Sequence, residues 1–127
     1  MQRDHAVLVI ENDDAVRDAL REVLFQDCAV VCVSSLESAR RLLSVLRFDV
    51  VLLDLLLGDG HGETLLSAMA KHAVPSAPVV VVSGWREAGR IARGYRVPFV
   101  RKPFDTDVIL SALRSAIDHR HEPHIPS

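Results

Sequence analysis

The sequence predicts an α/β domain in which a doubly wound parallel sheet of five strands, in the order 2-1-3-4-5, lies between two layers of helices. Short apolar runs alternate along the chain with longer segments of helical period. The runs are apolar throughout, which is typical of parallel strands buried on both faces. The chain has 127 residues, enough for one hydrophobic core, so a single folded domain is expected.

The predicted strands are short runs rich in β-branched residues. They are Ala6–Ile10, Ala29–Val33, Asp49–Leu53, Pro78–Ser83 and Pro98–Arg101. Because connections between parallel strands are right-handed, the strand order given above is the simplest arrangement of the five units. Ligands of such sheets bind beyond the carboxyl ends of the strands, where the direction of winding switches. We therefore expect a site at that edge.

Four predicted helices have apolar residues at the spacing of one helix face. They span Val16–Leu24, Ala39–Leu46, Leu65–Met69 and Val108–Ile117. We expect the second of them to open at Ser34, with Glu37 at the spacing of a capping box, and the last to begin near Asp105. The segment Arg86–Arg93 lies among three glycines, which predicts a short or irregular helix there.

Composition excludes several classes of protein. Hydrophobic residues make up 49% of the chain and charged residues 25%, which argues against disordered, collagen-like and coiled-coil proteins. A net charge of -2 gives no whole-molecule attraction to nucleic acid or to an anionic membrane. The apolar stretches are far shorter than the roughly 20 residues that cross a bilayer. The first residues carry no export signal, so we expect a cytoplasmic protein.

We expect one folded domain over residues 1–120 and a flexible C-terminal tail over residues 121–127. The histidines near this end are interpreted as part of a frayed terminus rather than as metal ligands. No DNA-binding domain is expected after the last helix. Cys28 and Cys32 are expected to be reduced, because the second half of a zinc site is missing.

Polar side chains follow the predicted strands at their carboxyl ends. In chain order they are Glu11, Asn12 and Asp13 after the first strand, Asp54 after the third, Ser83 at the end of the fourth and Lys102 after the fifth. Carboxylate and amide oxygens form a hard ligand set that suits Mg²⁺ rather than zinc or copper. A hydroxyl and an ammonium group opposite them suit a bound anion, above all a phosphoryl group.

Each of these residues also has an ordinary structural explanation. Asp13 could cap the following helix, Ser83 could bond to the backbone, and Lys102 could be a solvated turn residue. Asp54 is the hardest to explain in this way, because it interrupts a long apolar run. An unpaired carboxylate there would cost several kcal/mol. The coincidence of all these residues at one edge therefore favours a functional site.

From about Ala6 to Ile117 the chain resembles the receiver domain of bacterial two-component response regulators. Four motifs in order carry the resemblance. They are the acidic pocket Val9–Asp13 with Arg17 beyond it, the phosphoacceptor stretch Asp54–Gly62, Ser83 followed by Gly84, and Phe99–Phe104 around the final lysine. The resemblance implies the flavodoxin-like three-layer fold and a single-domain, stand-alone regulator.

The resemblance also implies the chemistry of the site. Asp54 would be the phosphoacceptor and would form an aspartyl phosphate, with Lys102 paired to a phosphoryl oxygen. The peptide bond from Lys102 to Pro103 would be cis. The ligands of the Mg²⁺ cofactor would be Glu11, Asn12, Asp54 and the backbone carbonyl of Leu56.

Ser83 and Phe99 would be the switch residues, through which phosphorylation alters the surface formed by the fourth helix, the fifth strand and the fifth helix. The phosphoryl donor would be a histidine kinase or a histidine phosphotransfer protein, and an unknown protein would be the downstream target. The chain would catalyse only its own phosphotransfer and dephosphorylation, so we do not expect an enzyme in the usual sense.

Two alternatives stay open. Asn12 stands where the family most often has aspartate, and the segment from Ser83 to Lys102 is short. These features motivate a degenerate receiver that binds proteins without being phosphorylated. A nucleotide binder or a phosphatase using Asp54 is disfavoured, because no glycine cradle follows the first strand and Leu56 offers no general base.

Overall fold

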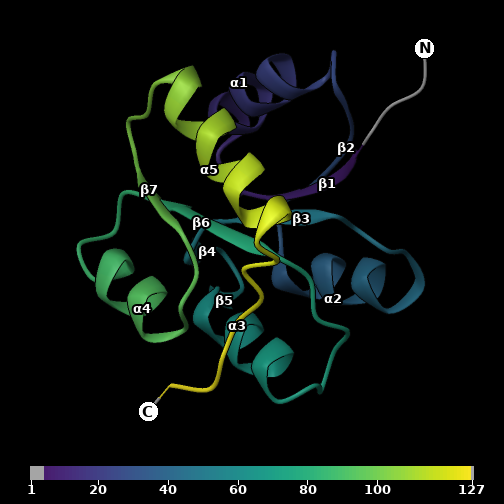
Figure 1. Cartoon of the computed structure of the whole chain (residues 1–127), viewed down its shortest axis with the longest axis vertical. Helices are drawn as coiled ribbons and strands as arrows, with labels where there is room; N and C mark the ends of the chain where they lie inside the picture. The colour runs from purple at the N-terminus through teal and green to yellow at the C-terminus, as the bar shows by residue number, and fades with distance from the viewer. Residues whose placement is uncertain (1–4, 127) are drawn as a thin grey trace.

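The structure is a computed structural model that describes residues 5–126. Within this range, five parallel strands form the central sheet (Figure 1). They are β1 (His5–Ile10), β2 (Cys28–Val33), β3 (Val50–Leu53), β6 (Val79–Ser83) and β7 (Phe99–Arg101). Their order, β2-β1-β3-β6-β7, confirms the predicted order 2-1-3-4-5. The prediction about an export signal rests on residues that include 1–4, which lie outside the described part.

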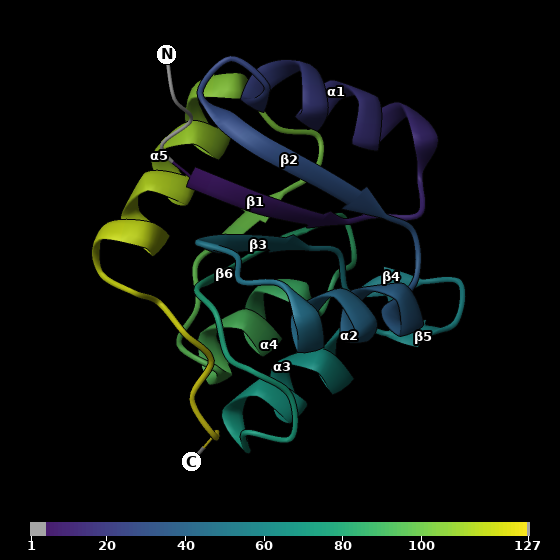
Figure 2. The same cartoon turned by 90° about the vertical axis from the view of Figure 1, so that its right-hand side faces the viewer.

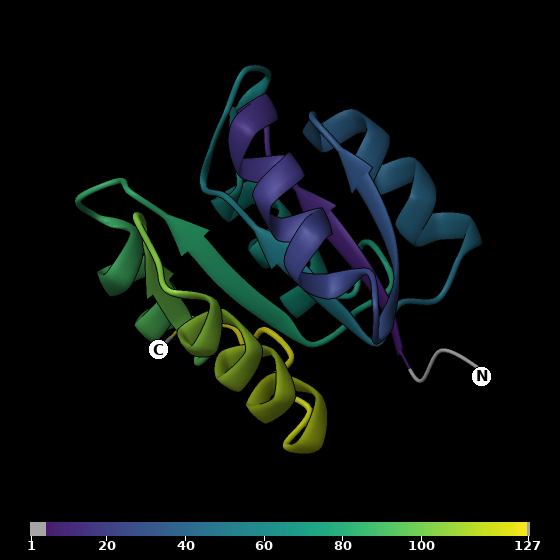
Figure 3. The same cartoon turned by 90° about the horizontal axis from the view of Figure 1, so that it is seen from above.

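Helices cover both faces of the sheet, as predicted. Figures 2 and 3 show α1 (Asp14–Leu24) and α5 (Thr106–Asp118) on one face. The other face carries α2 (Leu36–Val45), α3 (Glu63–Ala70) and α4 (Ala88–Gly94). At seven residues, α4 is the shortest helix among the described residues, which agrees with the short helix predicted from its glycines.

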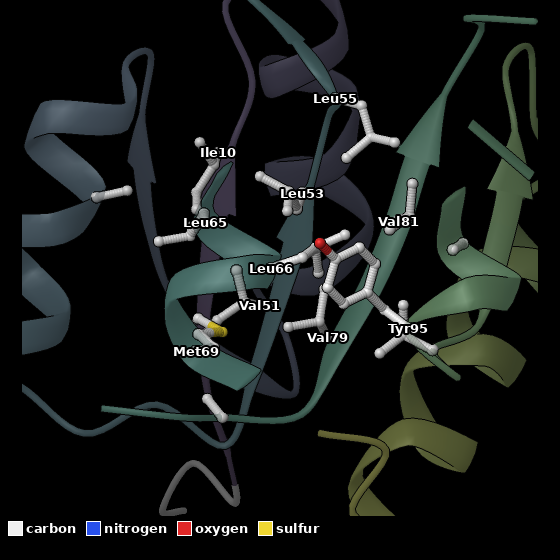
Figure 4. Packing of buried hydrophobic residues seen from close by; sticks show 14 of the residues in the cluster. Ile10, Val51, Leu53, Leu55, Leu65, Leu66, Met69, Val79, Val81 and Tyr95 are labelled. Carbon is white, nitrogen blue, oxygen red and sulfur yellow. The ribbon is translucent and has the colours of Figure 1, made fainter. Parts of the chain in front are cut away.

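The alternation of side chains along each strand divides the core into two clusters. Val7 and Val9 of β1 pack with α1 and α5 on one side, while Leu8 and Ile10 pack with the three helices on the other. Figure 4 shows the larger cluster, in which residues of α3 lie over the central strands. Both faces of residues 7–10 in β1 and of β3 are thus buried, and this is why these residues are apolar without interruption.

The start of α2 differs from its prediction by one residue. The N-cap is Ser35, whose hydroxyl oxygen accepts a hydrogen bond from Ser38 N at 3.1 Å, and not Ser34. Glu37 does not complete a capping box but pairs with Arg41. The position of the cap is set by a distant contact, because the first N–H groups of α2 donate to a carboxylate of the loop after β3.

A small hairpin that the sequence did not predict follows β3. Its strands are β4 (Leu56–Leu57) and β5 (Gly60–His61), and they pair antiparallel. At Gly62, directly after the hairpin, an added Cβ would lie 2.5 Å from the carbonyl oxygen of Asp54. Only glycine therefore lets the chain return so close to the end of β3.

The segment after α5 runs back along the molecule (Figure 1), and the flexibility expected of residues 121–127 stays a prediction. His121 O accepts a hydrogen bond from Val79 N at 3.1 Å, and His124 N donates to Tyr95 O at 2.9 Å. Pro123 between them is buried. The start of β6 and the end of α4 thus obtain backbone partners that no local pattern indicates. Ser127 lies outside the described residues.

Two further predictions concern the whole chain. Cys28 and Cys32 form no disulfide, as expected. Among residues 5–126, no helix combines the length and the apolar character needed to cross a membrane.

Candidate functional site

Two carboxylates lie at the carboxyl ends of the two central strands, where the direction of winding switches. Glu11 follows β1 and is 2% exposed, and Asp54 follows β3 and is 6% exposed. Their backbone N–H groups extend the sheet ladder by donating to Val33 O and Ile10 O, both at 3.0 Å. The apolar strands therefore hold both side chains in place at the edge predicted from the sequence.

Lys102 joins these two carboxylates. Its Nζ lies 2.9 Å from Asp54 Oδ2 and 2.5 Å from Glu11 Oε1. The other oxygen of each carboxylate accepts a backbone hydrogen bond, Asp54 Oδ1 from Leu56 N at 3.2 Å and Glu11 Oε2 from Asp13 N at 3.1 Å. One ammonium group thus pairs with both carboxylates, and backbone N–H groups bind their other oxygens, which makes the burial of the two acids tolerable.

The backbone places Lys102 at this point. Lys102 N donates to Ser83 O at 3.1 Å, which extends the pairing of β6 with β7 by one residue. The peptide bond from Lys102 to Pro103 is cis, as the resemblance implied. The lysine side chain is 20% exposed, so it is partly open to solvent while its ammonium group contacts both acids.

The electrostatics of the cluster favour a charged lysine. The pKa of Glu11 lies above its usual 4.5, and burial of the carboxyl group is the main cause. The hydrogen bonds from Lys102 and Asp13 N lower this pKa by less than burial raises it. The nearby Asp54 carboxylate raises it further. Burial alone would lower the pKa of Lys102, but the hydrogen bonds to Glu11 and Asp54 outweigh it and raise this pKa above 10.5. Lys102 is therefore a cation at neutral pH.

Ser83 is fully buried at the end of β6. Its hydroxyl oxygen accepts a hydrogen bond from Trp85 N at 3.2 Å, the ordinary backbone role that the sequence left open. A serine hydroxyl has one proton to donate besides its acceptor sites. The proton of Ser83 is not used by this bond and is available to an acceptor.

Asn12 and Asp13 follow Glu11 and differ in role. Asp13 caps α1, its Oδ1 accepting from Ala15 N at 2.9 Å and Val16 N at 3.2 Å, so the ordinary explanation is correct for this residue. Asn12 is exposed beside the cluster. The position of Arg17 beyond the acidic pocket is also explained, because its Nη1 donates to Glu11 O at 2.8 Å and fixes the turn after β1.

The oxygen atoms at this edge fit a hard cation. Two carboxylates share one ammonium group, an amide follows one of them, and the hairpin begins at Leu56, which is 42% exposed. In the described part of the chain, no three His, Cys, Asp or Glu side chains form a metal cluster. The oxygens at this edge come from carboxylates, an amide and the backbone, and such oxygens are of the kind that suits a partly hydrated Mg²⁺.

Asp59 has a structural role that the sequence did not reveal. Its Oδ1 accepts from Leu36 N at 3.0 Å and its Oδ2 from Glu37 N at 3.2 Å, at the N-terminus of α2. These bonds, the one from Leu36 first, lower its pKa below the usual 3.8. With both oxygens engaged away from Lys102, Asp59 is not part of the carboxylate cluster. No sequence pattern signals a cap 23 residues away.

Aromatic rings connect the elements on the side of α4. The rings of His61 and Trp85 lie 5.4 Å apart between centroids, linking the hairpin to the loop after β6. The Arg101 guanidinium lies 5.0 Å from the centroid of the Phe99 ring, and its Nη1 donates to Trp85 O at 3.3 Å. Phe99 also touches α4, where a Cβ on Gly89 would lie 3.2 Å from the ring.

Comparison with known proteins places this geometry in a family. The response regulator receiver domain matches residues 7–114. The chain is 32% identical over 120 residues to the C4-dicarboxylate transport transcriptional regulatory protein DctD of Pseudomonas aeruginosa, covering 90% of this chain and 25% of that protein. It is 31% identical over 119 residues to the regulatory protein VirG of Rhizobium rhizogenes, covering 90% and 48%. The chain thus spans between a quarter and a half of the length of these two relatives.

Solved structures agree with the sequence comparison. The non-phosphorylated HemR receiver domain from Leptospira biflexa superposes with a TM-score of 0.77 at 29% identity, covering 90% of this chain and 94% of that one. A CheY-like receiver domain from Methylobacillus flagellatus gives a TM-score of 0.76 at 26% identity, covering 87% and 97%. The chain therefore belongs to the response regulator receiver domain family of two-component systems.

Proposed function

We propose that the chain is a phosphorylation-dependent signalling module of the cytoplasm, which accepts a phosphoryl group on Asp54 from a histidine kinase or a histidine phosphotransfer protein. The contact of one ammonium group, that of Lys102, with both Asp54 and Glu11 carries this proposal. It joins a candidate nucleophile, a candidate metal ligand and a cation for the incoming phosphoryl oxygens in one buried cluster.

In the proposed reaction a carboxylate oxygen of Asp54 attacks the phosphorus of a phosphohistidine or acyl phosphate donor. The new bond joins this oxygen to phosphorus, and the bond from phosphorus to the donor breaks, its electron pair leaving with the donor. Lys102 neutralises a phosphoryl oxygen, and its raised pKa keeps it charged for this role.

The residues that would hold Mg²⁺ are Glu11, Asn12, Asp54 and the backbone carbonyl of Leu56. When bound, the cation supplies positive charge against the repulsion between the phosphoryl oxygens and the carboxylates. Ser83 would donate its free hydroxyl proton to another phosphoryl oxygen. A shift of Ser83 toward that oxygen would act on β7, where Arg101 is the partner of Ser83 and Phe99 is the partner of Val81.

The proposed output is a change in the α4–β7–α5 surface. Phe99 lies at the start of β7 against Gly89 of α4, so a movement of its ring alters the contact between these two elements. A two-state change of this kind needs only that the phosphorylated site favour one ring position over the other. The chain itself would act as a regulatory domain that catalyses only its own phosphotransfer and dephosphorylation.

Intact-mass analysis after incubation with a small acyl phosphate and Mg²⁺ tests the proposal. We expect one phosphoryl adduct on the natural chain and on Asp59→Asn, a matched control that removes a nearby aspartate outside the cluster. We expect none on Asp54→Asn or after chelation of the metal. An adduct that survives Asp54→Asn and disappears in Asp59→Asn would overturn the assignment of the phosphoacceptor. No adduct on any variant would favour the degenerate receiver.

A further inference from the structure

A surface pocket of about 620 Å³ lies on the face of the sheet that carries α3 and α4, apart from the cluster of Glu11, Asp54 and Lys102 (Figure 2). Its volume falls within the roughly 300–1,000 Å³ that is typical of small-molecule sites. Four segments supply the lining, namely the hairpin, α3, the loop after β6 and the end of α4. The lining residues are His61, Glu63, Thr64, Ser67, Trp85 and Tyr95. We call this site the aromatic pocket.

Two rings of the aromatic pocket are held in place by the protein itself. The centroids of the His61 and Trp85 rings lie 5.4 Å apart, with 30° between the ring planes. Thr64 Oγ1 donates to His61 O at 2.9 Å, and Trp85 N donates to Ser83 Oγ at 3.2 Å, so both residues are tied to neighbouring elements. A wall that is already ordered loses little conformational freedom when a ligand binds. The face of an indole ring attracts flat rings and cations.

Tyr95 brings a hydroxyl group without a protein partner to this pocket. The residue is only 7% exposed, and Figure 4 shows its ring extending from the end of α4 with the hydroxyl oxygen directed toward α3. Among residues 5–126, the hydroxyl group makes no hydrogen bond. A tyrosine hydroxyl at such a buried position usually has a partner. This group therefore points to a ligand in the pocket.

The polar groups of the lining are mainly acceptors of hydrogen bonds. Glu63 is half-buried, and its carboxylate forms no ion pair within residues 5–126. The hydroxyl oxygens of Ser67 and Tyr95 can accept as well as donate. Neither lysine nor arginine occurs among the lining residues. The lining thus suits a ligand with several N–H groups and a positive charge, since hydrogen bonds from a cation to a carboxylate are the stronger kind.

We propose that the aromatic pocket binds a small, planar aromatic cation. Its ring lies against Trp85, and its N–H groups donate to the Glu63 carboxylate and to the hydroxyl oxygen of Tyr95. An amidinium or guanidinium group attached to an aromatic ring has this chemistry, because it is flat, charged and rich in N–H donors. A carboxylate ligand of the same shape would meet the negative charge of Glu63 instead.

The effect of the ligand on signalling rests on the proposed function, although its binding does not. Trp85 N donates to the hydroxyl oxygen of Ser83, and His61 belongs to the hairpin that follows Asp54. A ligand held between these two segments keeps the loop after β6 in the position described here. Phosphorylation of Asp54 requires Ser83 to turn toward the phosphoryl group, so the bound ligand slows it.

The test titrates the full, unmodified chain with benzamidine and follows the fluorescence of Trp85, which lines the pocket. We expect Glu63→Gln to weaken binding about tenfold and Tyr95→Phe about threefold, in line with the loss of a charged and of a neutral hydrogen bond. Tyr95→Phe should melt no lower than the natural chain, because no internal hydrogen bond is lost. Glu22→Gln, at an exposed position of α1 on the opposite face of the sheet, makes the same change of charge as Glu63→Gln and should leave binding unchanged.

Two further probes separate the contributions of charge and ring. Benzoate, which has the same shape and the opposite charge, should bind at least about tenfold more weakly than benzamidine, and cyclohexanecarboxamidine, which lacks the flat ring, about fivefold more weakly. Absence of benzamidine binding, benzoate binding as tight as that of benzamidine, or equal benzamidine binding by Glu63→Gln and the natural chain would each overturn the proposal.

The rate of phosphoryl adduct formation tests the link to Ser83. Benzamidine at saturation should slow this rate in the natural chain, and the same concentration should slow it less in Glu63→Gln. An unchanged rate in the natural chain would overturn the link. If the natural chain forms no adduct at all, the proposed function fails, while the binding measurements on unmodified protein still decide whether the pocket takes a planar cation.

Discussion

The charged residues at the ends of the central strands differ from those around α4 in burial and in pairing. Glu11 and Asp54 are buried, and both pair with the half-buried Lys102. The arginines around α4 are exposed and mostly uncompensated within the described residues. A buried cluster must be complete in itself because each missing partner is costly. An exposed face tolerates excess charge, because water solvates each charged group there.

The largest effect is expected from Lys102→Met, which removes the cation from the carboxylate cluster. Removing the cation leaves two buried carboxylates unpaired, so we expect the free energy of unfolding at pH 7 to fall by about 3 kcal/mol. Urea unfolding measures this change. Lys71→Met, at an exposed lysine after α3, is the matched control and should change stability by less than about 0.5 kcal/mol.

The loss in Lys102→Met should depend on pH. The pKa of Glu11 is already raised by burial, and without Lys102 it rises further. A carboxyl group whose pKa is higher in the folded state binds its proton there first, so stability relative to pH 7 is regained as the pH falls toward the folded pKa. A loss equal to that of Lys71→Met, or one that grows on acidification, would show that the cluster is not held by these charges.

The second prediction concerns Asn12, the neutral member of the proposed ligand set. Asn12→Asp adds a carboxylate near the proposed metal position, and we expect Mg²⁺ to bind about tenfold more tightly, equivalent to about 1.4 kcal/mol. Titration of the fluorescence of Trp85, the only tryptophan, measures this affinity. The added like charge should also lower the metal-free melting temperature.

Gln26→Glu is the control for this change, because it adds one negative charge at an exposed position after α1. It should alter Mg²⁺ affinity far less than Asn12→Asp does, since exposed charges at a distance are screened. Equal or weaker Mg²⁺ binding in Asn12→Asp would remove Asn12 from the ligand set and strengthen the degenerate alternative.

A feature could be predicted from the sequence when the interactions that determine it join residues close together along the chain, or when the strand order alone brings the residues together. The strand order and the ends of the strands depend on local apolar runs, and Asp54 was identifiable because it interrupts one of them. The ammonium contact to Glu11 and Asp54 depends on the fold as a whole, but parallel strands bring their carboxyl ends to one edge. The positions of these residues therefore followed from topology alone.

Features fixed by single distant contacts could not be predicted. Ser34 was chosen as the cap of α2, but Asp59 fixes the first turn one residue later, at Ser35. The hairpin after Asp54 depends on the close return of Gly62, and the segment after α5 binds backbone groups of β6 and α4. In each case the partner lies far along the chain, where neither periodicity nor spacing reports it.

Substitutions at two glycines of α4 test how tightly the Phe99 ring packs against this helix. Gly94 has nothing within 4 Å of an added Cβ, so Gly94→Ala should raise stability by about 0.5–1 kcal/mol through helix propensity. Gly89→Ala places its methyl group 3.2 Å from the Phe99 ring and should gain less or lose stability. Thermal unfolding compares the two variants. Equal gains at both positions would show that the Phe99 ring is loosely held against α4.

The smallest expected effect belongs to Asp59, an exposed carboxylate whose role is to cap α2 from the hairpin loop. Its pKa is lowered first by the hydrogen bond from Leu36 N. A carboxyl group with a lowered folded pKa stabilises the protein above its unfolded value of about 3.8, and this contribution disappears as the pH falls through the folded value. Asp59→Asn should therefore lower the melting temperature slightly at neutral pH, with the difference closing below about pH 3.8.

Melts of the two proteins between about pH 7 and about pH 3 test this dependence. Asp107→Asn is the control, because Asp107 lies in the first turn of α5 and shares the favourable interaction with a helix N-terminus. If capping by the hydrogen bonds from Leu36 and Glu37 is what matters, Asp59→Asn should cost more than Asp107→Asn. Equal losses of stability would show that Asp59 acts only through its charge near the N-terminus of α2. The start of α2 would then be determined by the burial of Leu36 rather than by the hydrogen bonds to Asp59.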